Sequence, residues 1–180
     1  MKFKVNTNEY VLLVDEQDNE TGLMEKMEAH EKGLLHRAFS VFIFNSKGEL
    51  LLQQRASSKY HSPLKWTNTC CSHQRKGEST IDAAKRRLKE EMGIECDVAT
   101  AYTFIYKADV GQGLIEHEFD HVLIGHFDGN DIPFNRDEVH AFKYVSFDQL
   151  EKELSQDPEQ FTKWFLITFN DLKKFIQKNN

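Results

Sequence analysis

The sequence predicts an α+β (mixed α/β) fold in which a central mixed β-sheet is flanked by helices. Strand-like runs precede and follow one well-marked helix, and an aromatic-rich tail predicts one or two further packed helices. Because strands and helices do not alternate one by one, this order argues against a series of βαβ units. The 180 residues suit a single domain over positions 1–180, and no linker or internal repeat divides them.

The predicted strands are short runs rich in β-branched and aromatic residues. Residues 10–15 form the first run, and a polar turn is expected at 18–22. Residues 39–44 and 50–54 flank the sequence Asn-Ser-Lys-Gly, and this arrangement is a hairpin signal. Further strands are predicted at 102–106, 119–127 and 142–146.

The clearest helix begins after Gly77. Ser79 can cap its first turn, and Asp82 follows three residues later, as in a capping box. Gly93 is the expected C-terminal cap. Apolar residues recur at three- and four-residue steps between these ends, namely Ile81, Ala84, Leu88 and Met92.

Composition narrows the class of protein. An apolar fraction of 39% with 14 Phe can build a core without disulfides, and the odd count of three cysteines argues for reduced thiols in the cytoplasm. A net charge of −6 without a basic tail argues against nucleic-acid binding, and neither a secretory signal nor a membrane span is expected. We therefore expect a cytoplasmic monomer or weak dimer that binds a small molecule.

The helix carries paired charges within a longer motif. Arg87 and Glu91 lie four residues apart, which by itself is typical of an exposed ion pair. The whole frame from residue 72 to residue 94, however, resembles the Nudix box. The matching residues are Glu78, Arg86, Leu88, Glu90, Glu91, Gly93 and Ile94. The frame departs from the box at Ser72, where the box has Gly, and at Arg87, where the box has a Glu of the hydrolytic metal site. A cation at 87 repels a metal and attracts an oxyanion.

A second group of residues has metal-ligand chemistry. Its members are His30, His36, His73, Glu116 and Glu118. On a strand, Glu116 and Glu118 face the same side, and two such carboxylates repel each other unless a cation lies between them or one is protonated. A mixed nitrogen and oxygen site suits Zn, Mn or Mg better than Ca. Cys71 lies two residues before His73, although a cysteine beside a strand is in itself typical of a small core residue.

Together these segments resemble the type 1 isopentenyl-diphosphate isomerases, a Nudix-like family, over most of the chain. The resemblance implies interconversion of isopentenyl and dimethylallyl diphosphate, with Cys71 and Glu118 as catalytic residues. It implies a divalent metal (Zn, Mn or Mg) on the five His and Glu residues, and a Mg held by Glu91 that bridges the substrate diphosphate. Diphosphate contacts are implied for Lys26, Arg55, Lys59 and Arg87. Tyr106 and Trp164 are implied beside the isoprenyl group.

The expected reaction runs through a tertiary carbocation in a site without water. The face of Trp164 can stabilise that cation, and we expect Glu118 to protonate first and Cys71 to act in the other step. The alternatives are a Nudix pyrophosphohydrolase acting on a nucleotide diphosphate and a non-catalytic ligand-binding module. No role is predicted for His61, His117, His121, His126 and His140.

Overall fold

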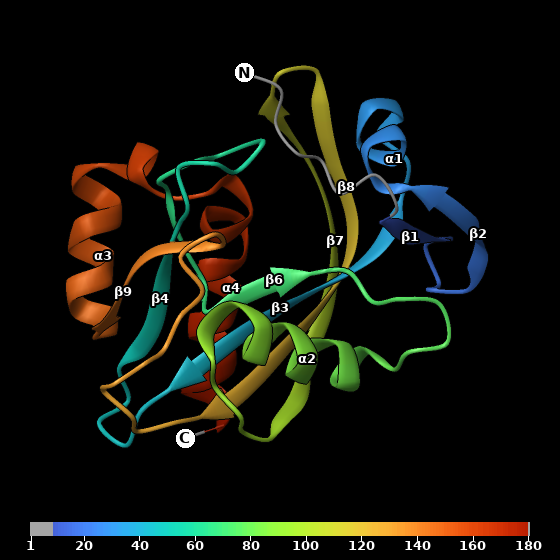
Figure 1. Cartoon of the computed structure of the whole chain (residues 1–180). Helices are drawn as coiled ribbons and strands as arrows, with labels where there is room; N and C mark the ends of the chain where they lie inside the picture. The colour runs from blue at the N-terminus through green and yellow to red at the C-terminus, as the bar shows by residue number, and fades with distance from the viewer. Residues whose placement is uncertain (1–8, 180) are drawn as a thin grey trace.

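The computed structural model describes residues 9–179, and Figure 1 shows the arrangement of its elements. The strands are β1 (Tyr10–Val14), β2 (Glu20–Glu25), β3 (His36–Phe44), β4 (Leu50–Arg55), β5 (Trp66–Thr67), β6 (Cys70–Ser72), β7 (Val98–Gly111), β8 (Leu114–His126) and β9 (Val139–Val145). The helices are α1 (Lys26–Lys32), α2 (Thr80–Met92), α3 (Phe147–Gln156) and α4 (Lys163–Asn179), with a 3₁₀ turn at Pro158–Gln160. No helix of this described part is long and apolar enough to cross a membrane.

All the described strands join one mixed sheet, and β3 is its central member. β3 pairs in parallel with β8 and antiparallel with β1, β4 and β6. β7 and β8 form a long antiparallel hairpin, and β9 extends the sheet beyond β4. The predicted α+β class with a mixed sheet is therefore confirmed.

Side-chain alternation along β3 builds a core on each face of the sheet. Phe39 and Ile43 pack in the core that contains α2, whereas Phe42 and Phe44 pack in the core that contains α4. Because successive side chains on a strand point to opposite faces, one buried strand supports both layers. Figure 1 shows α2 in front of the sheet and α4 behind it.

Helix α2 has the predicted ends. The Ser79 hydroxyl accepts the Asp82 backbone N–H, and Gly93 adopts φ 67° at the C-cap while its N–H donates to the Lys89 carbonyl. One prediction on this helix is wrong: Ile81 is exposed, and Ala83 is buried in its place. Ala83 and Ala84 fill the core at this end of the helix, and Ile81 remains outside it.

The N-terminal third departs most from the sequence prediction. The polar turn expected at 18–22 ends earlier, because Glu20 to Gly22 already belong to β2. Neither β2 nor α1 was predicted, since β2 is an exposed edge strand without apolar alternation and α1 has only seven residues. Strands β7 and β8 extend beyond the predicted runs. Residues 1–8, where no secretory signal is expected, lie outside the described residues.

Candidate active site

The register of the central strands brings distant candidate residues together. His36 on β3 lies beside Glu118 on the parallel strand β8. Four residues further along β3, Ser40 lies opposite Cys71 on the antiparallel strand β6. Cys71 and Glu118 therefore lie on two strands that flank β3. Each has its Cβ atom within about 5 Å of the β3 residue with which it pairs.

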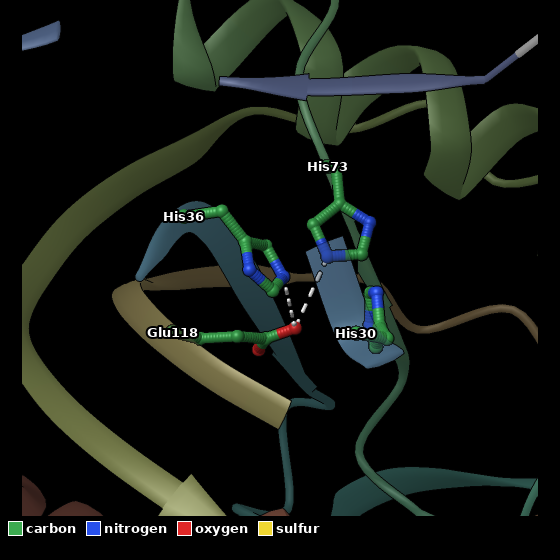
Figure 2. A group of neighbouring side chains, drawn as sticks. All are labelled: His30, His36, His73 and Glu118. Atoms are coloured by element: carbon green, nitrogen blue, oxygen red, sulfur yellow. Dashed lines mark hydrogen bonds and ion pairs between the residues drawn. The ribbon is translucent and has the colours of Figure 1, made fainter. Parts of the chain in front are cut away.

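Three histidines and one glutamate form a compact group at the end of β3. The group is His30, His36, His73 and Glu118, and one potential ligand atom from each lies within 4.8 Å of the others. The Glu118 Oε1 atom is 3.1 Å from His73 Nε2 and 3.5 Å from His36 Nε2, as Figure 2 shows. Burial lowers the pKa of His73 to about 3, so its imidazole is neutral at physiological pH.

The histidine orientations fit a divalent metal. His30 Nδ1 lies 2.7 Å from the Lys26 carbonyl oxygen, and His36 Nδ1 lies 2.8 Å from the Leu34 carbonyl oxygen. Each contact stabilises the tautomer that carries its hydrogen on Nδ1 and leaves a lone pair on Nε2. Both Nε2 atoms are buried and have no hydrogen-bond partner within the described residues. Such orphaned lone pairs, directed at one carboxylate, form a donor set that can hold a divalent metal.

Tyr106 links the two carboxylates of β8. Its hydroxyl oxygen lies 2.6 Å from Glu118 Oε2 and 3.0 Å from Glu116 Oε2. Burial would raise the pKa of Glu118, but its contacts with His36 and His73 lower it well below its ordinary value. For Glu116, burial and then the charge of Glu118 raise the pKa. The two neighbouring carboxyl groups therefore have pKa values shifted in opposite directions.

A cavity of about 60 Å³ joins this group to the other candidate residues. Its walls include Lys26, Arg55, Lys59, Cys71, Arg87, Glu91, Tyr106, Glu116, Glu118 and Trp164. Desolvation raises the pKa of the Cys71 thiol above its ordinary value. Trp164 is 2% exposed, and its ring lies 5.3 Å from the guanidinium carbon of Arg55. The structure therefore places an acid, a thiol and an aromatic face around one small space.

Arg55 is the buried cation of this cavity. It is 8% exposed, and no carboxylate of the described residues forms a salt bridge with it. Its Nη2 donates to the His61 carbonyl at 3.1 Å, while its Nε has no partner among these residues. Leaving a guanidinium buried and uncompensated is costly, so Arg55 favours an anionic ligand in the cavity.

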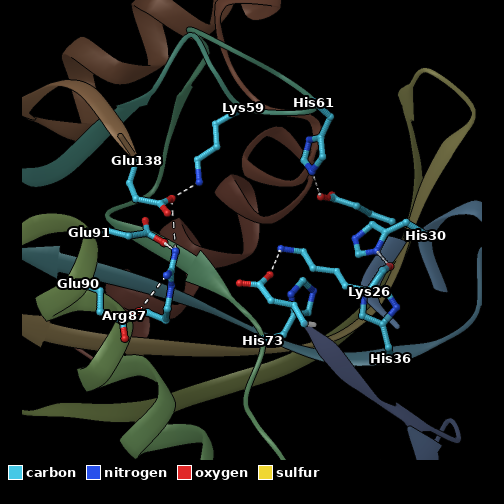
Figure 3. Close-up of polar contacts among 12 residues, drawn as sticks. Lys26, His30, His36, Lys59, His61, His73, Arg87, Glu90, Glu91 and Glu138 are labelled. Carbon is cyan, nitrogen blue, oxygen red and sulfur yellow. Dashed lines mark hydrogen bonds and ion pairs between the residues drawn. The ribbon is translucent and has the colours of Figure 1, made fainter. Parts of the chain in front are cut away.

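The other cations of the cavity are paired with carboxylates, as Figure 3 shows. Lys26 Nζ lies 2.9 Å from Glu9 Oε2, and Lys59 pairs with Glu138. Arg87 contacts Glu138 at 3.5 Å and also pairs with Glu91, four residues later on α2. Each pairing holds a positive group at the cavity wall, where an anionic ligand can contact it.

Two predicted metal ligands lie apart from the four-residue group. Glu91 accepts from Gln53 Nε2 at 2.9 Å and pairs with Arg87, so it lies on the α2 side of the cavity. Glu116 is held by Tyr106 and is not a member of the group. His117 faces away from both β8 glutamates, as predicted, and its Nδ1 lies 3.0 Å from the Gly33 carbonyl oxygen.

Sequence reasoning missed His61, to which it gave no role. The structure places it in the same cavity, with Nε2 3.4 Å from Glu116 Oε1. Burial is the main cause that lowers the pKa of His61, to about 2. The only sequence signal is its position between Arg55 and Trp66, in a loop that carries Lys59.

A larger open hollow of about 470 Å³ adjoins the cavity and shares Lys26, Ser72, His73 and Arg87 with it. Arg75 and Lys76 are exposed on its rim, and neither forms a salt bridge among the described residues. Because its rim is positively charged, this hollow can attract an anion and lead it to the cavity.

Fold and site together define a class of protein. The family model described as NUDIX domain matches residues 34–165. Solved structures with the same fold include DR0079 from Deinococcus radiodurans, with a TM-score of 0.68 and 20% identity over 82% of this chain and 90% of that chain. A MutT protein from Methanosarcina mazei has a TM-score of 0.63 and 22% identity over 81% and 96%.

Curated relatives that are more similar in sequence than these solved structures identify the family within the NUDIX-domain proteins. The isopentenyl-diphosphate Delta-isomerase of Pectobacterium atrosepticum is 52% identical over 93% of this chain and 93% of its own length. The isopentenyl-diphosphate Delta-isomerase of Aliivibrio fischeri is 43% identical over 96% and 99%. The chain belongs to the isopentenyl-diphosphate Delta-isomerase family of NUDIX-domain proteins.

Proposed function

We propose that this chain interconverts isopentenyl diphosphate and dimethylallyl diphosphate as a single-domain enzyme. The observation that carries the proposal is the buried Arg55, which has no carboxylate partner among the described residues and lies in one cavity with Cys71, Glu118 and Trp164. A diphosphate supplies the missing negative charge, and the thiol, the carboxyl and the indole surround the space next to it. Family membership supports the same activity.

The diphosphate end of the substrate is assigned to cations. Arg55, Lys26, Lys59 and Arg87 would bind its oxygens, and Glu91 would hold a Mg that neutralises part of the diphosphate charge. Arg87 replaces an acidic residue of the hydrolytic Nudix pattern. This change supports retention of diphosphate binding without attack of water on the phosphorus.

The His and Glu group is assigned to a divalent metal. His30, His36, His73 and Glu118 would hold it, with Glu116 as a further ligand, and Zn, Mn and Mg all suit this donor set. Positive charge at that position would acidify the neighbouring carboxyl groups.

The isomerisation itself is assigned to Glu118 and Cys71. Glu118 would add a proton to the terminal alkene carbon, which gives a tertiary carbocation, and Cys71 would remove a proton from the carbon next to the diphosphate-bearing one. Tyr106, 2.6 Å from Glu118 Oε2, would orient the acid proton. The π face of Trp164 would stabilise the cation, a contribution of about 2 kcal/mol in a desolvated site.

Proton NMR in deuterated water tests this function. Isopentenyl diphosphate should convert to an equilibrium mixture and take up deuterium, and a chelator should stop both changes. Phosphate release from nucleoside triphosphates without isomerisation would instead indicate a pyrophosphohydrolase.

Variants test the residue roles. Cys71→Ala and Glu118→Gln should each lose nearly all turnover while still binding inorganic diphosphate in calorimetry. His117→Gln is the matched control on β8, because its side chain faces the opposite side of the strand. Ordinary turnover by the Cys71 or the Glu118 variant would remove that residue from the mechanism.

The three cysteines are free thiols in the structure, which supports a reducing compartment, and we propose the cytoplasm. We further propose that the protein acts as a monomer or weak dimer.

A further inference from the structure

His61 contacts three residues of the proposed site at once. Its Nε2 atom lies 3.4 Å from Glu116 Oε1, and its ring meets the Trp164 indole edge-on, with centroids 5.7 Å apart and planes at 86°. Its backbone carbonyl accepts the Arg55 Nη2 hydrogen at 3.1 Å. The side chain is only 3% exposed, so these contacts form in a desolvated space.

The loop that carries His61 has an unusual backbone. Ser62 and Leu64 adopt φ values of 49° and 59°, a left-handed conformation that costs an L-residue free energy. The Leu64 N–H donates to the Arg55 carbonyl and the Arg55 N–H donates to the Lys65 carbonyl, which fixes the loop against β4. Strain of this kind persists where the surrounding structure holds one conformation, and here that conformation buries His61.

The ring has a defined environment on each side. The Tyr60 ring contacts the His61 ring edge-on, with centroids 4.5 Å apart. This contact restricts rotation of the imidazole, which a surface histidine would not experience. His61 Nδ1 lies 3.3 Å from the Ser62 hydroxyl oxygen. If that hydroxyl donates to Nδ1, the ring hydrogen resides on Nε2, the ring atom that lies 3.4 Å from Glu116 Oε1.

A line of polar contacts runs from His61 to Glu118. Glu116 meets His61 through Oε1 and Tyr106 through Oε2, and the Tyr106 hydroxyl then reaches Glu118. His61 is thus the far end of a series of contacts whose near end is the proposed catalytic acid. An imidazole N–H that orients a metal-binding carboxylate influences metal affinity in the same way as other groups that hydrogen-bond to metal ligands.

We infer that His61 is a positioning residue of this site, which holds the Glu116 carboxylate through its ring N–H and the Trp164 indole plane through its ring edge. The inference rests on the isomerase function proposed above. His61 needs no contact with the substrate, and it acts through the two residues that it orients.

Two substitutions separate the two contacts. His61→Phe keeps an aromatic edge against Trp164 and removes the N–H, whereas His61→Gln keeps an N–H donor near Glu116 and removes the ring. We expect His61→Phe to lower kcat by about 10- to 100-fold and to weaken binding of Mn²⁺ to the substrate-free protein by about tenfold. KM for isopentenyl diphosphate should stay within about twofold, because the diphosphate contacts lie elsewhere. His61→Gln should recover most of the Mn²⁺ affinity.

Equilibrium dialysis with Mn²⁺ and steady-state kinetics measure these effects. Wild-type kcat and Mn²⁺ affinity in His61→Phe would overturn the inference, as would equal loss of Mn²⁺ affinity in both variants. If either variant is unstable, a double-mutant cycle of His61→Gln with Glu116→Gln tests the same contact. Non-additive changes in Mn²⁺ affinity would support an interaction between His61 and Glu116, and additive changes would refute it. Absence of isomerisation by the wild-type chain would reject the proposed function, and the Mn²⁺ measurements would still judge His61 separately.

Discussion

Gly93 ends helix α2, and its substitution by alanine tests how tightly the end of this helix packs against Pro133. The residue has φ +67°, and a Cβ atom built there would lie 2.7 Å from Pro133 Cγ and 2.8 Å from the Pro133 carbonyl oxygen. The Pro133 segment cannot move away freely, because the Asn135 N–H donates to the Glu91 carbonyl at 2.8 Å and fixes it to the same helix. Gly93→Ala therefore combines a left-handed alanine with a backbone clash.

The magnitude follows from these two parts. A left-handed conformation costs an alanine about 1–2 kcal/mol, and forcing an extra methyl into a packed contact costs about 1–3 kcal/mol more. Gly93→Ala should lower the free energy of unfolding by about 2–5 kcal/mol. Gly77→Ala is the matched control, since Gly77 has φ +79° with nothing within 4 Å of the added Cβ, and only the conformational cost of about 1–2 kcal/mol should remain.

Urea unfolding followed by circular dichroism measures both variants against the parent chain. The difference between the two costs isolates the contact with Pro133. Equal costs for the two substitutions would refute the claim that the segment around Pro133, between β8 and β9, packs tightly against the end of α2.

Four further predictions concern charge, the thiol and binding. Lys76→Gln on the rim of the open hollow should lower kcat/KM by roughly two- to threefold at low salt, leave kcat unchanged and lose this effect at high salt, and a salt-independent loss would contradict steering. Arg87→Lys should raise KM for isopentenyl diphosphate several-fold, because lysine lacks the bidentate fork, and an unchanged KM would remove the contact. Glu78→Gln should cost about 1–2 kcal/mol at neutral pH. The Arg86 guanidinium, which donates to both Glu78 oxygens, holds the pKa of Glu78 below its ordinary value, so this stabilisation is present above the ordinary carboxyl pKa and is lost as pH falls through the lowered one. Urea unfolding of both proteins over acidic and neutral pH checks that sign. In the metal-free protein, burial raises the pKa of the Cys71 thiol, so alkylation of Cys71 by iodoacetamide at neutral pH should be much slower than that of free cysteine, and rapid Cys71-dependent alkylation would show an ionised thiol.

Helix α2 shows what a local signal can predict. Its cap at Ser79 and its end at Gly93 follow from residues within one turn of each boundary, and the structure has both. The common face of Glu116 and Glu118 also follows from local geometry, because alternation along a strand depends only on the backbone. Ile81 was misjudged, since periodicity alone does not show which apolar positions the rest of the fold covers.

Edge elements lie beyond such signals. Strand β2 is exposed along most of its length, so its sequence carries no apolar alternation, and its pairing with β1 is what makes it a strand. Helix α1 is short, and its formation depends on the Glu25 cap, the left-handed Gly33 and contact with the rest of the fold.

The sequence by itself determined the residue types of the site and the α2 frame that carries Arg87 and Glu91, because those patterns are local in the chain. Tertiary structure decided which of the candidates meet. His36 reaches Glu118 only through the parallel register of β3 and β8, and His61 reaches Glu116 only through a strained loop folded against Trp164. Register and loop burial depend on contacts between residues that lie tens of positions apart, and spacing in the sequence does not encode such distances.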